Sequence, residues 1–265
     1  MKRKRIFVGI FLAVVLALLY LPIVVVAVFS FNENTNRFTY NFTGFSLQYY
    51  EQLFRDTKGL LAALWQSLKL ALYSCGISAV IGTLGAVGMA RRKFRFSGAI
   101  EGLATFPAMI PEIILAMAFL AMFSAVGLPF GMVTLVLSHV TFCIPYIFIV
   151  VKGRLAGMDP ELPEAARDLG AGPVRTFLTV TLPLIFPGVL SGTLLAFAMS
   201  MDDFVISYFV TGSRTTTLPI KIYASVRTGV SLQVNALSTL MIGVVFLTVA
   251  FFRLIRRNKT IRRGE

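Results

Sequence analysis

Acidic residues lie deep inside two apolar stretches of this sequence, where a charged side chain is costly. Glu112 lies between Pro111 and Ile113 in one stretch, and Asp202 and Asp203 are adjacent in another. An Asp at the centre of a membrane helix costs about 2.5–3.5 kcal/mol on insertion scales, so such groups usually face a cavity or a partner. Two neighbouring carboxylates also repel each other, which favours a bound cation. We expect these residues to line a path for a cationic solute and to disfavour an anion.

The two adjacent aspartates cannot both face one path squarely, because successive helix positions point about 100° apart. One of them can line the path while the other caps a helix, pairs or meets a partner subunit. The alternative is that Asp202 and Asp203 reach the outer interface and are simply solvated, since they lie roughly 28–30 Å along a helix that starts at Pro183. For Glu112 the alternative is a buried, hydrogen-bonded acid.

Four further side chains could contribute to a polar site. Tyr49 and Tyr208 could attract ammonium groups through their ring faces, although packing explains either ring equally well. Ser200 is a weaker candidate for the same path. His139 is the single histidine of the chain and lies within an apolar stretch, where we expect a hydrogen-bonded packing residue rather than a metal ligand.

Motifs that would indicate catalysis by this chain are absent. The sequence contains no G-x-x-x-x-G-K-[ST] phosphate loop, no G-x-S-x-G and no H-E-x-x-H. Cys75 and Cys143 lie in apolar stretches without ligand spacing, so neither a disulfide framework nor a metal site is expected. The sequence predicts a transport or scaffold protein that is not an enzyme and holds no cofactor or metal of its own.

The composition places these residues in a membrane. The chain has 265 residues, a mean hydropathy of +0.80, 57% hydrophobic residues and 14% charged residues, which is too apolar for a soluble domain. We expect one domain, residues 1–265. A helix needs about 20 apolar residues to cross the bilayer, and by this criterion the sequence predicts six membrane-spanning helices. They are Ile6–Phe29, Leu68–Ala90, Ala99–Phe123, Phe130–Val151, Pro183–Val210 and Val234–Ile255.

Basic residues gather in four clusters that six spans place on one side of the membrane. Cytoplasmic loops are enriched in Lys and Arg, so both termini are predicted to be cytoplasmic. The same pattern argues against a nucleic-acid surface, despite the net charge of +13. The clusters are Lys2, Arg3, Lys4 and Arg5; Arg91, Arg92, Lys93 and Arg95; Lys152, Arg154, Arg167 and Arg175; and Arg253, Arg256, Arg257, Lys259, Arg262 and Arg263.

The cytoplasmic loop of residues 153–182 contains signals for a short helix of about ten residues. Asp159 followed by Pro160 is typical of a helix start, because the aspartate can cap and the proline lacks an N–H that would otherwise be unpaired. Gly170 and the Gly172-Pro173 pair end the element. The small side chains of Ala165 and Ala166 would let the helix lie flush against another surface.

This loop resembles a known motif. The segment Glu-Ala-Ala-Arg-Asp-Leu-Gly at 164–170, followed by Leu-Pro at 182–183, resembles the EAA loop of ABC-importer permeases. In that family the loop inserts into a cleft on the cytoplasmic ATPase subunit. The resemblance therefore implies an ATPase-coupling role for the residues Glu164, Ala165, Ala166, Asp168 and Gly170.

The segments at 200–204, 209–212 and 218–223 extend the resemblance to PotC-type permeases of spermidine/putrescine importers. It implies an all-α, type I ABC-importer permease in the bacterial inner membrane, which carries polyamines by alternating access. The implied partners are a homologous PotB-type permease, two ATPase subunits that bind ATP and Mg, an extracytoplasmic polyamine-binding protein and membrane lipid. The alternatives are a permease of this family for another solute, a proton-coupled secondary transporter and a structural scaffold.

Overall fold

The computed structural model describes residues 2–34, 36, 41–56, 58–91, 95–229 and 231–261. These residues are mostly helical and form no strand, only one isolated bridge between Asn32 and Phe45. The predicted basic residues Arg92, Lys93, Arg262 and Arg263 lie outside this set, and the side chains of 2–5, 91, 252 and 254–261 are not described either. The all-helical class is as predicted.

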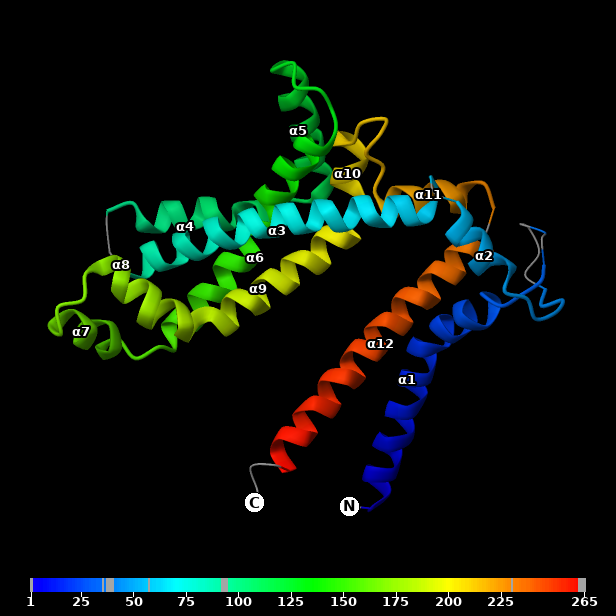
Figure 1. The fold of residues 1–265 in the computed structure, drawn as a ribbon, viewed down its shortest axis with the longest axis horizontal. Helices are drawn as coiled ribbons and strands as arrows, with labels where there is room; N and C mark the ends of the chain where they lie inside the picture. The colour runs from blue at the N-terminus through cyan, green and yellow to red at the C-terminus, as the bar shows by residue number, and fades with distance from the viewer. Residues whose placement is uncertain are drawn as a thin grey trace. The chain divides into compact units, whose positions relative to one another are not determined.

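The helices follow one another along the chain as Figure 1 shows. Two short elements, marked η, are a 3₁₀ turn (η1) and a π-helical turn (η2). The elements are α1 (Lys2–Phe29), α2 (Gln48–Arg55), α3 (Leu60–Arg91), α4 (Ser97–Thr105), η1 (Phe106–Ala108), α5 (Glu112–Ala125), α6 (Met132–Ala156), α7 (Glu161–Asp168), α8 (Pro173–Thr176), η2 (Phe177–Thr181), α9 (Leu182–Asp202), α10 (Val205–Val210), α11 (Leu218–Arg227) and α12 (Leu232–Ile261).

Among the described residues, five helices are long and apolar enough to cross a membrane, or six if one bent pair counts as a single span. The first has the predicted bounds, Ile6–Phe29. The other four are Leu60–Ala90, Met132–Ala156, Pro173–Asp202 and Leu232–Phe251. Helices therefore lie at the predicted apolar stretches, but only the first has the predicted bounds. The second begins at Leu60 and not at Leu68, and the third and fifth differ most.

The third predicted span, Ala99–Phe123, is not a straight helix. The segments Ser97–Ala108 and Glu112–Ala125 meet at a bend of 100°. Proline lacks an N–H and clashes with the preceding turn, so Pro107 and Pro111 explain why the helix breaks here. As a result Glu112 is the first residue of α5. The prediction that it lies midway along a helix is therefore wrong.

The fifth predicted span, Pro183–Val210, differs at both ends. Helical structure begins at Pro173 and stops at Asp202, and Asp203 has extended backbone angles of φ −62° and ψ 117°. The prediction that the helix starts at Pro183 is therefore wrong. Pro183 has no N–H to donate, and the π-helical turn η2 directly before α9 accommodates it within the helical run. Asp202 and Asp203 are therefore not successive positions of one helix, and the 100° argument does not apply to them.

The chain forms two compact units, residues 63–220 and the combination of 1–62 with 221–265. In the first unit, α6 packs between α3 and α9 by way of glycines. A side chain on Gly192 would lie 3.1 Å from the Cα of Ile147, and one on Gly82 would lie 3.2 Å from its Cβ. Ile147 is completely buried between these two glycines. Small residues let membrane helices approach closely and gain dispersion contacts, as they do here.

The second unit joins α1, α2 and α12. Gln233 at the start of α12 donates to Gln52 of α2 at 2.9 Å, and the hydroxyls of Ser30 and Tyr50 lie 2.7 Å apart. The apolar side chains of α1 are almost all exposed in the chain by itself. An exposed helix of this composition is stable when lipid surrounds it.

The close approach of α6 and α9 gives a first prediction. Replacing Gly192 by leucine forces a side chain into the backbone of Ile147, and overpacking of this kind costs about 1–3 kcal/mol. A Cβ on Gly76 of α3 would meet no described atom within 4 Å, so this glycine provides the matched control. In the purified chain, Gly192→Leu should lower the apparent melting temperature and Gly76→Leu should not. Equal melting temperatures would contradict the glycine-mediated packing.

Candidate functional site

Asp203 occupies the break between α9 and α10. Its Oδ1 accepts the backbone N–H of Ile206 at 3.2 Å, and its Oδ2 accepts that of Ser207 at 2.8 Å. These two N–H groups belong to the first turn of α10 and have no helical partner. The extended backbone of Asp203 aims the carboxylate at them, so this buried residue caps α10.

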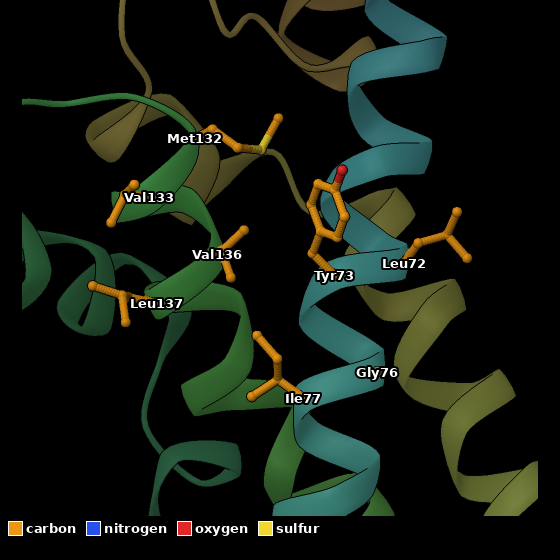
Figure 2. Close-up of a pocket in the computed structure, with 8 residues that line it drawn as sticks. All are labelled: Leu72, Tyr73, Gly76, Ile77, Met132, Val133, Val136 and Leu137. Atoms are coloured by element: carbon orange, nitrogen blue, oxygen red, sulfur yellow. The ribbon is translucent and has the colours of Figure 1, made fainter.

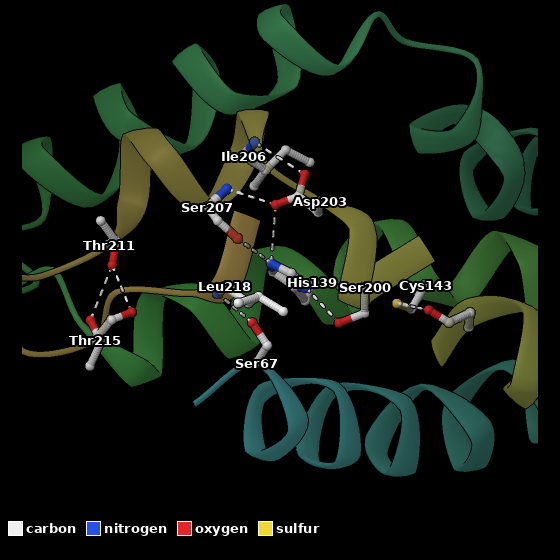
Figure 3. A network of polar contacts seen from close by, with 11 residues as sticks. Ser67, His139, Cys143, Ser200, Asp203, Ile206, Ser207, Thr211, Thr215 and Leu218 are labelled. Carbon is white, nitrogen blue, oxygen red and sulfur yellow. Dashed lines mark hydrogen bonds and ion pairs between the residues drawn. The ribbon is translucent and has the colours of Figure 1, made fainter. Parts of the chain in front are cut away.

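His139 approaches the same carboxylate from α6. Its Nε2 lies 3.4 Å from Oδ2 of Asp203 and 3.0 Å from the hydroxyl of Ser207, and its Nδ1 lies 2.8 Å from the hydroxyl of Ser200. Figure 3 shows the imidazole between the two serines. His139 is fully buried, and Ser207 is as well. Both ring nitrogens are therefore occupied by groups from the two sides of the α9–α10 break.

A cavity of about 240 Å³ opens beside this network. Asp203 and Glu112 both line it, the first from the break and the second from the start of α5. Tyr146 and Phe142 of α6 contribute two aromatic walls, and the remaining lining residues are apolar. No Lys or Arg is among the described residues that line the cavity, so the charge that it presents is negative. An acidic, partly aromatic cavity suits an ammonium group better than an anion.

The other predicted path residues lie in different surroundings. Asp202 is exposed at the end of α9, while Ser200 is 3% exposed and contacts His139. Tyr208 is 51% exposed and lies beside the rings of Phe204 and Phe209. Of the two aspartates, the structure brings only Asp203 together with Glu112.

Tyr49 belongs to the unit that contains α1, α2 and α12. It lies in α2, is partly buried, and its hydroxyl donates to the backbone carbonyl of Asn34. The acidic cavity is lined by residues of the other unit.

The segment with the EAA motif forms a short exposed helix, α7. Asp159 caps it, because its Oδ1 accepts the backbone N–H of Glu161 at 3.0 Å. Gly170 ends it with a φ of +87°, a left-handed conformation that glycine adopts without strain. Leu169 is 90% exposed. Glu164, Ala165 and Asp168 are exposed and Ala166 is half-buried.

A second hollow lies elsewhere in the same unit. Figure 2 shows an apolar groove between α3 and α6, lined by residues such as Tyr73, Gly76, Val133 and Leu137. None of the described residues that line it carries a charge, so it offers no carboxylate to attract a cation. The acidic cavity is the better candidate site.

The contact between His139 and Asp203 is not predictable from the sequence. His139 is hydrogen-bonded, as predicted, but its serine partners lie 61 and 68 residues further along the chain. The one signal in the sequence is that a histidine lies in one apolar stretch and two aspartates lie in another. This signal is weak, because it does not indicate that the histidine contacts an aspartate. The pairing depends on how α6 packs against α9.

These observations define a class: a helical membrane protein that spans the bilayer several times and has an acidic cavity among its helices. Residues 78–260 match the family described as binding-protein-dependent transport system inner membrane component. The chain belongs to this family, and as an inner membrane component it is a permease subunit and not the ATPase.

Similar proteins narrow the family further. The chain is 40% identical over 248 residues to the spermidine/putrescine transport system permease protein PotC of Haemophilus influenzae, covering 94% of this chain and 95% of that protein. It is 39% identical over 252 residues to PotC of Escherichia coli K12, covering 95% and 94%. It is 38% identical over 250 residues to the putrescine transport system permease protein PotI of the same strain, covering 91% and 88%. The resemblance to PotC-type permeases is confirmed.

Solved structures share the fold at low sequence identity. A bacterial ABC transporter involved in the import of alginate superimposes with a TM-score of 0.73 at 13% identity, covering 97% of this chain and 98% of that one. The complex of the alginate transporter with a pentasaccharide-bound periplasmic protein gives 0.70 at 18% identity, covering 95% and 93%. The fold is thus that of an ABC-importer permease.

The capping role of Asp203 gives a second prediction. Asp203→Ala leaves two backbone N–H groups of α10 without their acceptor, at about 1–3 kcal/mol for each unpaired buried donor. Asp202→Ala alters an exposed neighbour and should cost less than about 0.5 kcal/mol. The melting temperature of the purified chain should fall for the first variant and stay near wild type for the second. A similar small effect for both would show that the cap contributes little.

Proposed function

We propose that this chain is the permease subunit of an ATP-driven importer of polyamines such as spermidine and putrescine. The observation that carries the proposal is the 40% identity with PotC of H. influenzae along nearly the whole of both chains. The two PotC proteins and PotI are all named as polyamine transport permeases. The acidic cavity supports the same substrate class, because a polyamine carries ammonium groups.

The substrate path in this proposal passes the cavity of Glu112 and Asp203. Carboxylates attract ammonium groups, and Tyr146 adds a ring face within the same cavity. Asp202, Ser200, Tyr208 and Tyr49 remain proposed path residues. Binding must be moderate, because transport requires that the solute be released on the other side.

The proposed coupling to ATP hydrolysis runs through α7. In this proposal residues 153–182 are a cytoplasmic loop within a single permease domain of residues 1–265, and both termini are cytoplasmic. Glu164, Ala165, Ala166, Asp168 and Gly170 would seat in a cleft of the ATPase. α7 packs against α8 and η2, and a continuous helical run leads from Pro173 to Asp202. In this proposal a displacement of α7 is transmitted along that run to the residue next to Asp203.

The proposed assembly contains four kinds of partner. They are a homologous PotB-type permease, two ATPase subunits that bind ATP and Mg, an extracytoplasmic polyamine-binding protein, and the lipid of the bacterial inner membrane. The complex of an alginate transporter with its periplasmic protein supports such an assembly through the shared fold.

Two alternatives lead to different transport measurements. A permease of the same family for another solute would not take up spermidine. A proton-coupled transporter, in which Glu112 and the aspartates carry protons, would stop when the proton gradient is collapsed at constant ATP. The exposed α7 helix favours ATP coupling, because a proton-driven carrier needs no surface for an ATPase.

Uptake of radiolabelled spermidine tests substrate and coupling together. A strain without polyamine importers should regain uptake when it expresses this chain with its partner subunits. Glu164→Ala should reduce that uptake at least about tenfold if the EAA helix transmits ATPase closure, which corresponds to about 1.4 kcal/mol. Glu161→Ala, one turn earlier on the same exposed helix, is the matched control. Uptake without the chain would refute the polyamine assignment, and full activity of Glu164→Ala would refute the coupling role.

Removal of a cavity charge should weaken substrate binding. A hydrogen bond to a charged group contributes about 1.5–3 kcal/mol, so Glu112→Gln should raise the KM for spermidine at least about tenfold. Glu51→Gln removes a charge of the same type from an exposed ion pair with Arg55 on α2 and should leave the KM unchanged. An equal KM for wild type and Glu112→Gln would remove Glu112 from the substrate path.

A further inference from the structure

His139 holds all three parts of the α9–α10 break at once. Ser200 lies in the last turn of α9, Asp203 forms the break, and Ser207 lies in α10. The ring contacts each of them at 2.8 to 3.4 Å and is fully buried. It comes from α6, the helix that packs between α3 and α9. The rigid core of the unit is thereby connected to the one aspartate that lines the acidic cavity.

We propose that His139 is a positioning residue, which holds the Asp203 carboxylate at the cavity and thereby sets the affinity for the cationic substrate. This inference rests on the proposed function. His139 does not line the cavity among the described residues, so it acts on the substrate through Asp203.

The contacts of the ring explain why a histidine suits this position. A serine hydroxyl can donate or accept a hydrogen bond, so Ser200 and Ser207 accommodate either form of the neutral ring and the charged ring as well. Nε2 can therefore direct a proton at Asp203 while Nδ1 remains bonded to Ser200. A carboxylate whose orientation is held by such contacts loses less freedom when it binds an ammonium group.

Among the residues that the structure describes, Asp203 makes no ion pair with a Lys or Arg. Nε2 of His139 lies 3.4 Å from Oδ2 of Asp203, and Glu112 lines the same cavity. Two carboxylates at one cavity repel each other, so an unrestrained Asp203 would turn away from Glu112. The ring and the two N–H groups of α10 oppose that movement. Loss of the ring should therefore weaken substrate binding more than it slows the transport cycle.

Kinetics of spermidine uptake by the complete transporter test the inference. His139→Leu should raise the KM at least about tenfold, while the maximal rate per transporter in the membrane changes by less than about twofold. His139→Gln keeps a donor and an acceptor and should remain within about threefold of the wild-type KM. Ser138→Ala is the matched control, because Ser138 is the neighbouring buried residue of α6 and its hydroxyl has no hydrogen-bond partner among the described residues.

A double variant separates positioning from packing. If His139 acts through Asp203, then His139→Leu combined with Asp203→Asn should have the KM of Asp203→Asn by itself, within about twofold. A KM of the double variant that equals the product of the two single effects would overturn the inference. An unchanged KM for His139→Leu, with a maximal rate that falls only in proportion to the amount of protein in the membrane, would overturn it as well. If His139→Leu does not reach the membrane, Ser207→Ala decides: a KM about threefold higher supports the inference and an unchanged KM overturns it.

The same measurements distinguish the inference from the function on which it rests. Wild-type transporter without spermidine uptake would overturn the proposed function. Wild-type uptake together with a normal KM for His139→Leu would overturn the positioning role and leave the function intact.

Discussion

Backbone N–H groups at a break between apolar helices need acceptors that lipid cannot provide, and Asp203 provides them for α10. The rest of the site depends on this interaction. It keeps the backbone of Asp203 extended, lets α9 stop at Asp202, and leaves one carboxylate between a buried histidine and an acidic cavity. A structural cap and a group that can attract a cation are thus the same side chain.

A second break completes the cavity. The 100° bend before α5 places Glu112 at a helix start, where it lines the cavity with Asp203. Both acidic groups therefore lie where helices end or begin, and neither lies in the middle of a straight span. Broken helices are tolerated in membranes where the freed backbone is buried in protein or lines a cavity, which agrees with this arrangement. The glycine contacts that seat α6 against α9 bring His139 to the same place.

How far the site could be predicted depends on the range of the interactions involved. The cap of α7 by Asp159 and its end at Gly170 were readable, because both depend on residues within a few positions. The start of the long helical run at Pro173 was not readable from the sequence, because a proline at position 183 indicates a helix start at that position. In the structure, a π-helical turn before Pro183 lets the helix continue through it. The difference between Asp202 and Asp203 could not be predicted from spacing, since it depends on the end of α9 at Asp202 and the extended backbone of Asp203.

The sequence by itself determined the membrane class, the approximate positions of the apolar segments, the EAA motif and the identity of the costly acidic residues. Those conclusions rest on composition, local periodicity and short motifs, which do not depend on how helices pack. Only the tertiary structure decided that Glu112 and Asp203 share a cavity, that Asp202 is exposed, and that His139 contacts Asp203. These residues are far apart in the chain, and the close packing of α6 against α9 together with the two helix breaks brings them together.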